Sequence, residues 1–213
     1  MNKKVFAIVL IVCLVLGAAF AKKGDFKLGG QLGIGVVTEK AKQKIVTVDT
    51  TTTTSNSGFY FAVAGEFEFA DNIAIKGEVG MNLLGKATVK ATAEGHTETA
   101  TASEKSPALF AMYVGGQYNI EVNKSINIAI GAGFDMLSGK MDNSDDAEKN
   151  TKLGLGIESI VAFKLQDNFT LDLGARISFF FANTKKDYSD AVKSLDSYSS
   201  TALKFFAGAT FAL

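Results

Sequence analysis

The sequence predicts an all-β fold, an eight-stranded antiparallel up-and-down transmembrane β-barrel, on the basis of three observations. Apolar and polar residues alternate in eight separate segments of about 12 residues, which is the pattern of strands with one apolar face. The connections between these segments are alternately long and short. The composition includes 21 Gly and 17 Phe but only one Pro. Because Pro removes a donor from a strand ladder, its rarity favours long, uninterrupted strands.

The first 21 residues have the pattern of a cleaved signal peptide, so we expect the barrel to comprise residues 22–213. Two lysines precede an apolar stretch at 5–16, and Ala19-Phe20-Ala21 matches an A-x-A cleavage site. The alternative is a helical membrane anchor, but the apolar stretch has only about 12 residues and a span needs about 20. Cys13 is the single cysteine and lies in this stretch. The mature chain is therefore expected to contain neither a disulfide nor a cysteine-ligated metal.

The strand segments follow one another through the mature chain without an intervening helical period. In each segment Leu, Ile, Val and Phe dominate one set of alternate positions, and Gly, small polar and charged residues dominate the other. The eight segments are 26–36, 59–69, 73–83, 110–120, 126–136, 153–165, 169–181 and 203–213.

The connections predict which end of the barrel faces which side. Three short connections carry turn residues at 71–72, 122–124 and 166–168. Four long connections span 39–57, 85–107, 139–150 and 183–198. The Thr50–Thr54 run in the first of them favours extended structure, so the first two strands are expected to project beyond the membrane. This arrangement puts both chain termini at the short-turn end, as in outer-membrane barrels with short periplasmic turns and long external loops.

Side-chain volume indicates that the apolar face points outward. An eight-stranded barrel has an interior just wide enough for side chains to fill. The apolar face carries most of the Phe, Leu and Ile residues, whereas the other face is rich in Gly, Ala and Ser. Large side chains outside and small ones inside therefore fit lipid contact better than the rival structure, a soluble lipocalin-like barrel with an apolar ligand cavity.

The aromatic residues predict two girdles at the membrane interfaces, separated by a band of aliphatic residues. The short-turn girdle comprises Phe26, Phe67, Phe69, Phe163, Phe169 and Phe211. The long-loop girdle comprises Phe59, Phe61, Phe179 and Phe181.

The inward face carries charges of both signs, which we expect to pair because isolated buried charges are costly. The predicted polar network of the lumen comprises Lys27, Glu66, Glu68, Lys76, Glu78, Asp135, Glu158, Lys164, Asp172, Arg176 and Lys204. A polar core that closes the lumen is favoured over an ion pathway, since eight strands leave little room for water.

No residue pattern predicts a catalytic site, a metal site or a cofactor. His96, the only histidine, falls in the second long loop near Glu98 and Ser103, without the spacing of a catalytic triad. An acidic cluster at 142–148 does not have the spacing of an EF-hand. We therefore expect a protein that is not an enzyme, with a rim hydrolase using His96 as the minor alternative.

The mature chain resembles small outer-membrane barrels of the OmpA/OmpX type. The resemblance rests on the A-x-A signal, the eight amphipathic strands, the alternating loop lengths, the mixed interior charge and the last strand with Phe205 and Phe211. It implies a place in the bacterial outer membrane, contact with outer-membrane lipid, and recognition of the last strand by the barrel-assembly machinery. The chain ends in Leu213, where such proteins often have an aromatic residue. The OmpW type, which conducts small apolar molecules, is a second resemblance.

These features predict a structural and surface-interaction role carried by the four external loops, which would contact an extracellular ligand or host surface. The alternatives are a narrow channel for small solutes or apolar molecules and the soluble ligand-binding barrel. Without the two N-terminal lysines the chain has 20 basic and 22 acidic side chains, so no basic surface for nucleic acid is expected. We expect a monomer.

Overall fold

The computed structural model describes residues 26–45, 48–105, 108–140, 149–181 and 195–213. The signal peptide predicted for 1–21 and the acidic cluster at 142–148 lie outside these ranges. The strands are β1 (Phe26–Ile45), β2 (Val48–Ala70), β3 (Ile73–Leu84), β4 (Lys86–Ala93), β5 (His96–Lys105), β6 (Leu109–Asn123), β7 (Ile126–Lys140), β8 (Lys149–Gln166), β9 (Phe169–Phe180) and β10 (Leu195–Ala212). Over the described ranges, no helix has the length and apolar character needed to cross a bilayer.

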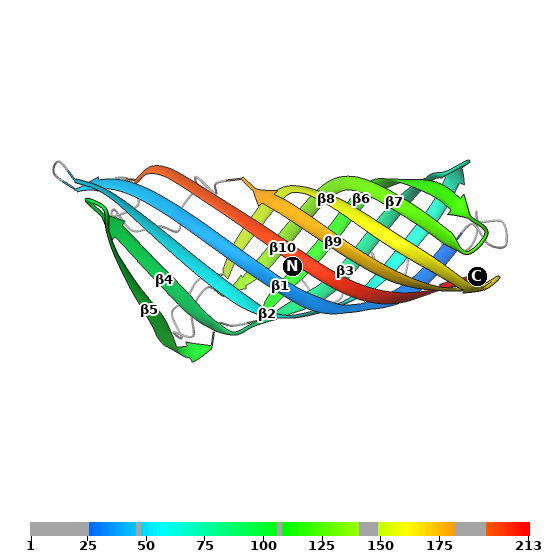
Figure 1. The fold of residues 1–213 in the computed structure, drawn as a ribbon, viewed down its shortest axis with the longest axis horizontal. Helices are drawn as coiled ribbons and strands as arrows, with labels where there is room; N and C mark the ends of the chain where they lie inside the picture. Colours follow the sequence, from blue (N-terminus) through cyan, green and yellow to red (C-terminus); the bar gives the residue numbers. More distant parts are fainter. Residues whose placement is uncertain (1–25, 46–47, 106–107, 141–148, 182–194) are drawn as a thin grey trace.

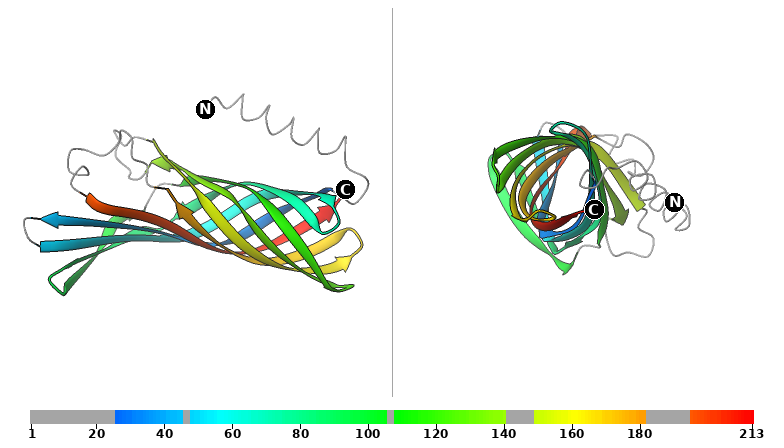
Figure 2. Two further views of the ribbon diagram at one scale, coloured as in Figure 1. Left: turned by 90° about the horizontal axis from the view of Figure 1, so that it is seen from above. Right: turned by 90° about the vertical axis from the view of Figure 1, so that its right-hand side faces the viewer.

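Eight of the strands close into an antiparallel barrel (Figures 1 and 2). The hydrogen-bonded order runs β1-β10-β9-β8-β7-β6-β3-β2, and β2 pairs again with β1 to complete the ring. The closing pair has continuous register from Phe26 opposite Phe67 to Ile45 opposite Val48. The predicted eight-stranded up-and-down barrel is therefore confirmed, and closure leaves none of these eight strands with an open edge in lipid.

Two connections that the sequence pattern suggested as loops are regular strands instead. Residues 39–45 and 48–57 prolong β1 and β2 beyond the barrel wall, and residues 86–105 form the β4–β5 hairpin. β4 pairs with Thr50–Ser55 of β2, in the part of β2 that extends beyond its pairing with β3, which ends at Gly58. The hairpin turns at Glu94-Gly95, both with positive φ, where Gly adopts the conformation without a Cβ clash. The extension of β1 and β2 agrees with the extended structure predicted from the Thr50–Thr54 run. The Thr- and Ala-rich residues 86–105 lack the apolar alternation of a barrel strand, so their sequence did not distinguish a polar hairpin from a loop.

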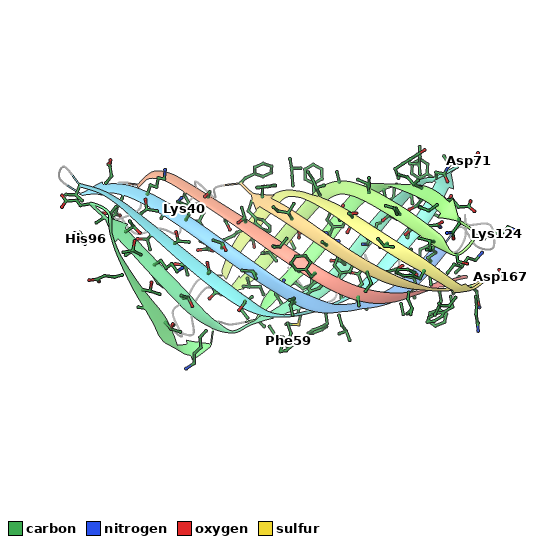
Figure 3. All side chains as sticks on the ribbon, viewed as in Figure 1. Lys40, Phe59, Asp71, His96, Lys124 and Asp167 are labelled. Carbon is green, nitrogen blue, oxygen red and sulfur yellow. The ribbon has the colours of Figure 1, made fainter. Side chains whose placement is uncertain are left out.

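Short turns close the opposite end of the barrel, at Asp71-Asn72, Lys124-Ser125 and Asp167-Asn168. Figure 3 shows Asp71, Lys124 and Asp167 together at that end, with Lys40 and His96 at the other. Leu213 donates its backbone N–H to the carbonyl of Phe26, so the first described strand and the chain's last residue meet at the short-turn end. This matches the polarity predicted from the connection lengths.

The inner face also holds large side chains, which differs from the expectation of small ones. Phe180 and Phe206 point inward between outward-facing Phe179, Phe181 and Phe205. Each lies opposite glycine: Phe206 is paired with Gly33 and Gly174, and Phe180 with Gly154. A neighbour without a side chain provides the space in which each ring fits inside a narrow barrel.

We expect Gly174→Ala to destabilise the folded barrel by about 1–3 kcal/mol, the usual range for overpacking a filled interior. A Cβ at Gly174 would lie 2.4 Å from the ring of Phe206, whereas a Cβ at Gly77 would have no atom within 4 Å. Gly77→Ala is therefore the matched control and should leave stability within about 0.5 kcal/mol. Urea unfolding of the barrel in detergent micelles measures both, and equal effects would show that the ring is not confined.

Candidate functional site in the lumen and at the outer end

The structure gathers the predicted lumen residues into two groups and leaves one at the edge. Six lie in a buried central cluster, which we call the ionic cluster: Lys76, Glu78, Asp135, Glu158, Arg176 and Lys204. Lys27, Glu66, Glu68 and Asp172 line a cavity near the short turns. Lys164 also lines this cavity, at its exposed rim, and lies 3.5 Å from Asp167 of the adjacent turn.

Arg176 on β9 is the centre of the ionic cluster and is 1% exposed. Its two terminal nitrogens donate to the two carboxylate oxygens of Glu78, at 2.8 and 2.7 Å. Its Nε and one terminal nitrogen also donate to Oε2 of Glu158, at 3.2 and 2.6 Å. The guanidinium lies 3.7 Å from the ring centroid of Tyr113. Arginine is suited to this position because its planar fork binds carboxylates bidentately and stacks on aromatic faces.

The two lysines of the cluster complete the charge balance. Lys76 lies 3.0 Å from Glu158 and 3.8 Å from Glu78. Lys204 lies 3.7 Å from Asp135 and 4.7 Å from the ring centroid of Tyr60. Three cations thus face three carboxylates in a space that water scarcely reaches. Such a network fills the middle of the lumen with mutually compensating charge.

Several residues that tighten this cluster were not identified as site residues from the sequence. Ser178 donates to Asp135 at 2.6 Å, and the hydroxyl of Tyr60 donates to Glu78. Tyr113 is fully buried beneath Arg176. The alternating pattern predicted that both tyrosines lie on the inner face, and this was the only sequence signal for them. Their hydrogen-bond and stacking partners could not be predicted, because these partners come from other strands.

An apolar layer covers the ionic cluster on the long-hairpin side. Its larger members are Val37, Leu84, Leu109, Leu137 and Phe180, all buried and part of one contiguous cluster. Lys152 lies opposite Leu137 in the β7–β8 ladder and makes an ion pair with Glu39. Lys152 also donates to the hydroxyl of Tyr198 at 3.1 Å. No sequence signal marked Lys152, since its partner Glu39 falls within a stretch predicted to be a loop.

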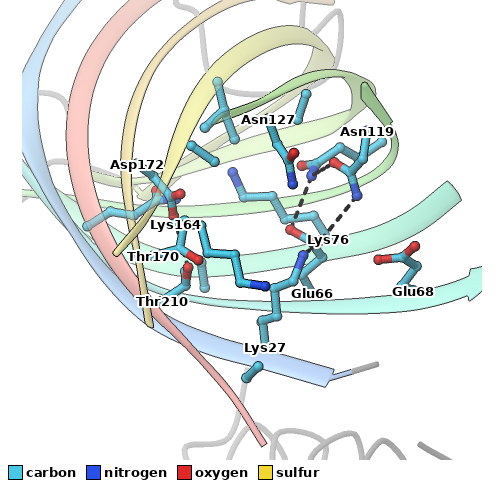
Figure 4. A pocket seen from close by; sticks show the side chains of 18 of the residues that line it. Lys27, Glu66, Glu68, Lys76, Asn119, Asn127, Lys164, Thr170, Asp172 and Thr210 are labelled. Carbon is cyan, nitrogen blue, oxygen red and sulfur yellow. Dashed lines mark hydrogen bonds and ion pairs between the residues drawn. The ribbon is translucent and has the colours of Figure 1, made fainter. Parts of the chain in front are cut away.

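The short-turn end of the lumen holds a polar cavity of about 290 Å³ (Figure 4). Lys27 donates to Glu66 at 2.7 Å, and Gln117 donates to the other oxygen of Glu66 at 3.1 Å. Asp172 accepts from the hydroxyl of Thr210 at 3.2 Å. Lys76 lines the cavity and also belongs to the ionic cluster, so the cavity ends where that cluster begins. The ionic cluster therefore closes the lumen at the inner end of this cavity, and we call the cluster in this role the plug.

The predicted girdle residues lie on the outer surface. Six are exposed: Phe59, Phe61, Phe69, Phe179, Phe181 and Phe211. Phe26, Phe67, Phe163 and Phe169 are half-buried, and the rings of Phe169 and Phe211 are 4.8 Å apart. Leu, Ile and Val side chains are exposed between the two ends. An apolar surface this extensive does not suit water, and the interior holds charge, so the soluble barrel with an apolar cavity is wrong.

His96 begins β5 and is exposed at the outer end, opposite the end that holds Asp71, Lys124 and Asp167 (Figure 3). Within the described ranges, no group of three or more His, Cys, Asp or Glu side chains is arranged to hold a metal ion.

No protein-family model matches the chain, and no curated protein matches its sequence significantly. Several solved structures match its fold. Neisserial surface protein A is 13% identical, with a TM-score of 0.56, over 91% of this chain and 100% of that one. The outer membrane protein OprG from Pseudomonas aeruginosa is 11% identical, with a TM-score of 0.50, over 91% of this chain and 99% of that one.

The outer membrane protease OmpT from Escherichia coli also matches, at 8% identity and a TM-score of 0.55, over 91% of this chain and 99% of that one. Similarity at these identities concerns the fold, which unrelated activities share. The chain has the fold of the small β-barrels of the bacterial outer membrane, the OmpA/OmpX type that its sequence predicted.

Proposed function

We propose that this protein is a closed, non-enzymatic barrel of the bacterial outer membrane whose role is played by its external hairpins. The observation that carries the proposal is the plugged lumen, where Arg176 bridges Glu78 and Glu158 across the interior. Because the apolar layer lies between this plug and the outer end, neither end offers a continuous polar path. Transport through the lumen is therefore not the function that the geometry favours.

The outer end supports a surface role, because it is built as a sheet. Beyond Gly35, the β1–β2 pair continues in register to Ile45 and Val48. At about 3.3 Å per residue, these ten residues of β1 reach roughly 30 Å along the strand. β4 and β5 widen this projection beside β2, and the start of β10 pairs with β1 on the other side, so the projection has five strands. We call it the outer platform. A sheet presents side chains at defined spacings, which suits recognition of an extracellular ligand or host surface better than a mobile loop would.

The comparison with a protease does not by itself assign an activity to this chain. His96 is exposed on the outer platform. The lumen acids pair with Arg and Lys and accept hydrogen bonds from Tyr60, Ser178 and Thr210, but the chain's single histidine is not among their partners. The rim hydrolase remains the minor alternative. The proposal includes export through a leader at residues 1–21, insertion by the barrel-assembly machinery and a monomeric state.

We expect the purified barrel, inserted into a planar lipid bilayer, to show no large, stable open steps. The physical reason is that Arg176, Lys76 and Lys204 are held in a dry cluster, and breaking one buried pair costs about 3–5 kcal/mol. A general porin inserted in the same bilayer is the positive control. Stable open steps from the wild-type barrel would favour the narrow channel and contradict the closed barrel.

A further inference from the structure

The outer platform has one face that is basic and rich in hydroxyl groups. Residues paired across an antiparallel ladder project to the same side of the sheet. The row through Lys40 contains Ser199, Lys40, Thr53, Lys90 and Thr99, on five successive strands. The row beyond it contains Lys42, Thr51, Thr92 and Thr97. The row before it contains Thr38, Ser55, Thr88 and Thr101. None of these three rows contains a carboxylate.

The lysines of this face are available to a ligand. Lys40, Lys42 and Lys90 are exposed, and no carboxylate of the described ranges lies within ion-pair distance of any of them. Acidic residues of the platform lie elsewhere. Glu39 points inward to Lys152, and Glu98 belongs to the opposite set of alternate positions on β5. Asp49 lies on the same face as Lys40 but in the next row outward, opposite Lys44, near the tip of the β1–β2 pair. The three rows are therefore basic and free of carboxylates, and the nearest acidic residue of this face lies beyond them.

The basic face continues the lipid-facing surface of the barrel. Along β1, the alternate positions that point outward run from Leu32 and Ile34, both exposed, through Val36 and Thr38 to Lys40. Lys40 comes six residues after Ile34, roughly 20 Å farther along the strand at about 3.3 Å per residue. A barrel strand tilts by about 35–45°, so the height gained is less, roughly 15 Å. Figure 3 shows Lys40 beyond Phe59 along the barrel axis. Because the headgroup region adds only about 5–8 Å on each side of the hydrocarbon core, the backbone of Lys40 lies above it, and the long side chain has to reach back toward the leaflet.

We infer that this face, with Lys40 and Lys90 at its centre, binds phosphate groups of glycolipid headgroups in the outer leaflet. The inference rests on the proposed function in one respect, that the long-hairpin end faces the exterior. Lysine ammonium groups bind phosphate as point charges, and Thr and Ser hydroxyls supply neutral donors beside them. Lys40 and Lys90 are two strands apart, roughly 10 Å at the usual strand spacing. They can therefore contact separate phosphates or one bis-phosphorylated headgroup.

Position on the barrel favours a lipid headgroup over a soluble polyanion. A soluble polyanion would be bound equally well by a basic patch at the far tip of the platform, where instead Asp49 lies. The unpaired lysines are concentrated in the rows that rise directly from the apolar band. Bound phosphates would hold the platform against the leaflet and leave its opposite face, which includes Glu98, toward the surroundings.

The test measures binding of bis-phosphorylated lipid A to the full barrel in neutral detergent micelles by native mass spectrometry. Each Lys near an anionic surface contributes about 1 kcal/mol, so Lys40→Gln/Lys90→Gln is expected to weaken binding by about 30-fold. Lys124→Gln/Lys164→Gln removes the same charge at the short-turn end and should stay within about twofold of wild type, because those lysines lie outside the proposed face. Dephosphorylated lipid A should bind wild type as weakly as the intact lipid binds the Lys40/Lys90 variant.

Two results would overturn the inference. One is equal affinity of wild type and the Lys40/Lys90 variant for bis-phosphorylated lipid A. The other is a variant that loses soluble heparin but keeps lipid A, which would identify a soluble polyanion as the partner. All four substituted lysines are exposed, so the variants should retain the heat-modifiable migration of a folded barrel. Bilayer conductance depends on the lumen and not on these lysines, so the closed-barrel proposal and the headgroup inference can fail separately.

Discussion

Replacing Arg176 with Met is expected to lower the free energy of unfolding by about 3–5 kcal/mol, the range for breaking a buried ion pair from one side. The guanidinium makes four contacts within hydrogen-bond distance to Glu78 and Glu158. Without it, three buried carboxylates face only Lys76 and Lys204. The chain contains no Trp, so urea unfolding in micelles is best followed by circular dichroism together with heat-modifiable gel migration.

The control for this prediction restores charge balance without restoring the pair. In Arg176→Met/Glu78→Gln, two cations again face two carboxylates, and the amide oxygen introduced at position 78 can still accept from Tyr60. We expect this double variant to recover more than half of the lost stability, since uncompensated charge contributes most of the penalty. If the double variant is as unstable as the single one, packing of the Arg176 stem and its stacking on Tyr113 dominate instead. A single variant within about 1 kcal/mol of wild type would mean that water reaches the cluster.

Leu173→Arg on the outer surface is expected to destabilise the barrel by about 2–4 kcal/mol in a lipid bilayer, the value for arginine near the bilayer midplane. Leu173 lies on β9 between Phe169 and Phe179, which belong to opposite girdles. The same change at Leu165, next to the 167–168 turn, should cost only about 0–1 kcal/mol, as for positions at the interface. The two leucines are 55% and 57% exposed, so they differ in depth rather than in accessibility.

This comparison also tests the outward orientation of the apolar face. Folding of both variants into phosphatidylcholine vesicles, measured by urea titration, gives the depth dependence directly. A barrel whose outer surface faced water would accept arginine at either exposed leucine with a change of about 0.5 kcal/mol or less. Equal, small effects would therefore contradict the lipid-facing band, whereas equal, large effects would place Leu165 inside the hydrocarbon layer.

The sequence predicted the inner and outer faces well but the platform and the site partners poorly. Alternation placed Arg176, Glu78 and Tyr60 inward because each strand has one lipid-facing side. Alternation did not predict the inward-facing Phe206, because Phe205 and Phe206 are consecutive and the pattern does not show which of the two points inward. Gly33 and Gly174, which pair with Phe206, leave room for its ring. The Thr50–Thr54 run indicated that the first two strands project beyond the membrane, but the β4–β5 hairpin of the platform was not predicted, because strands exposed on both faces lack an apolar period.

The sequence by itself determined the number and order of the barrel strands, the short-turn end and the face that meets lipid, because these depend on period-two alternation and on turn residues close together in the chain. Only the tertiary structure decided which charges pair. Arg176 and Glu78 are 98 positions apart, Lys76 and Glu158 are 82 apart, and Lys152 and Glu39 are 113 apart. Contacts across a lumen depend on the stagger of all eight strands around the ring. A local pattern carries no information about that stagger, so the plug and the platform appear only when the barrel closes.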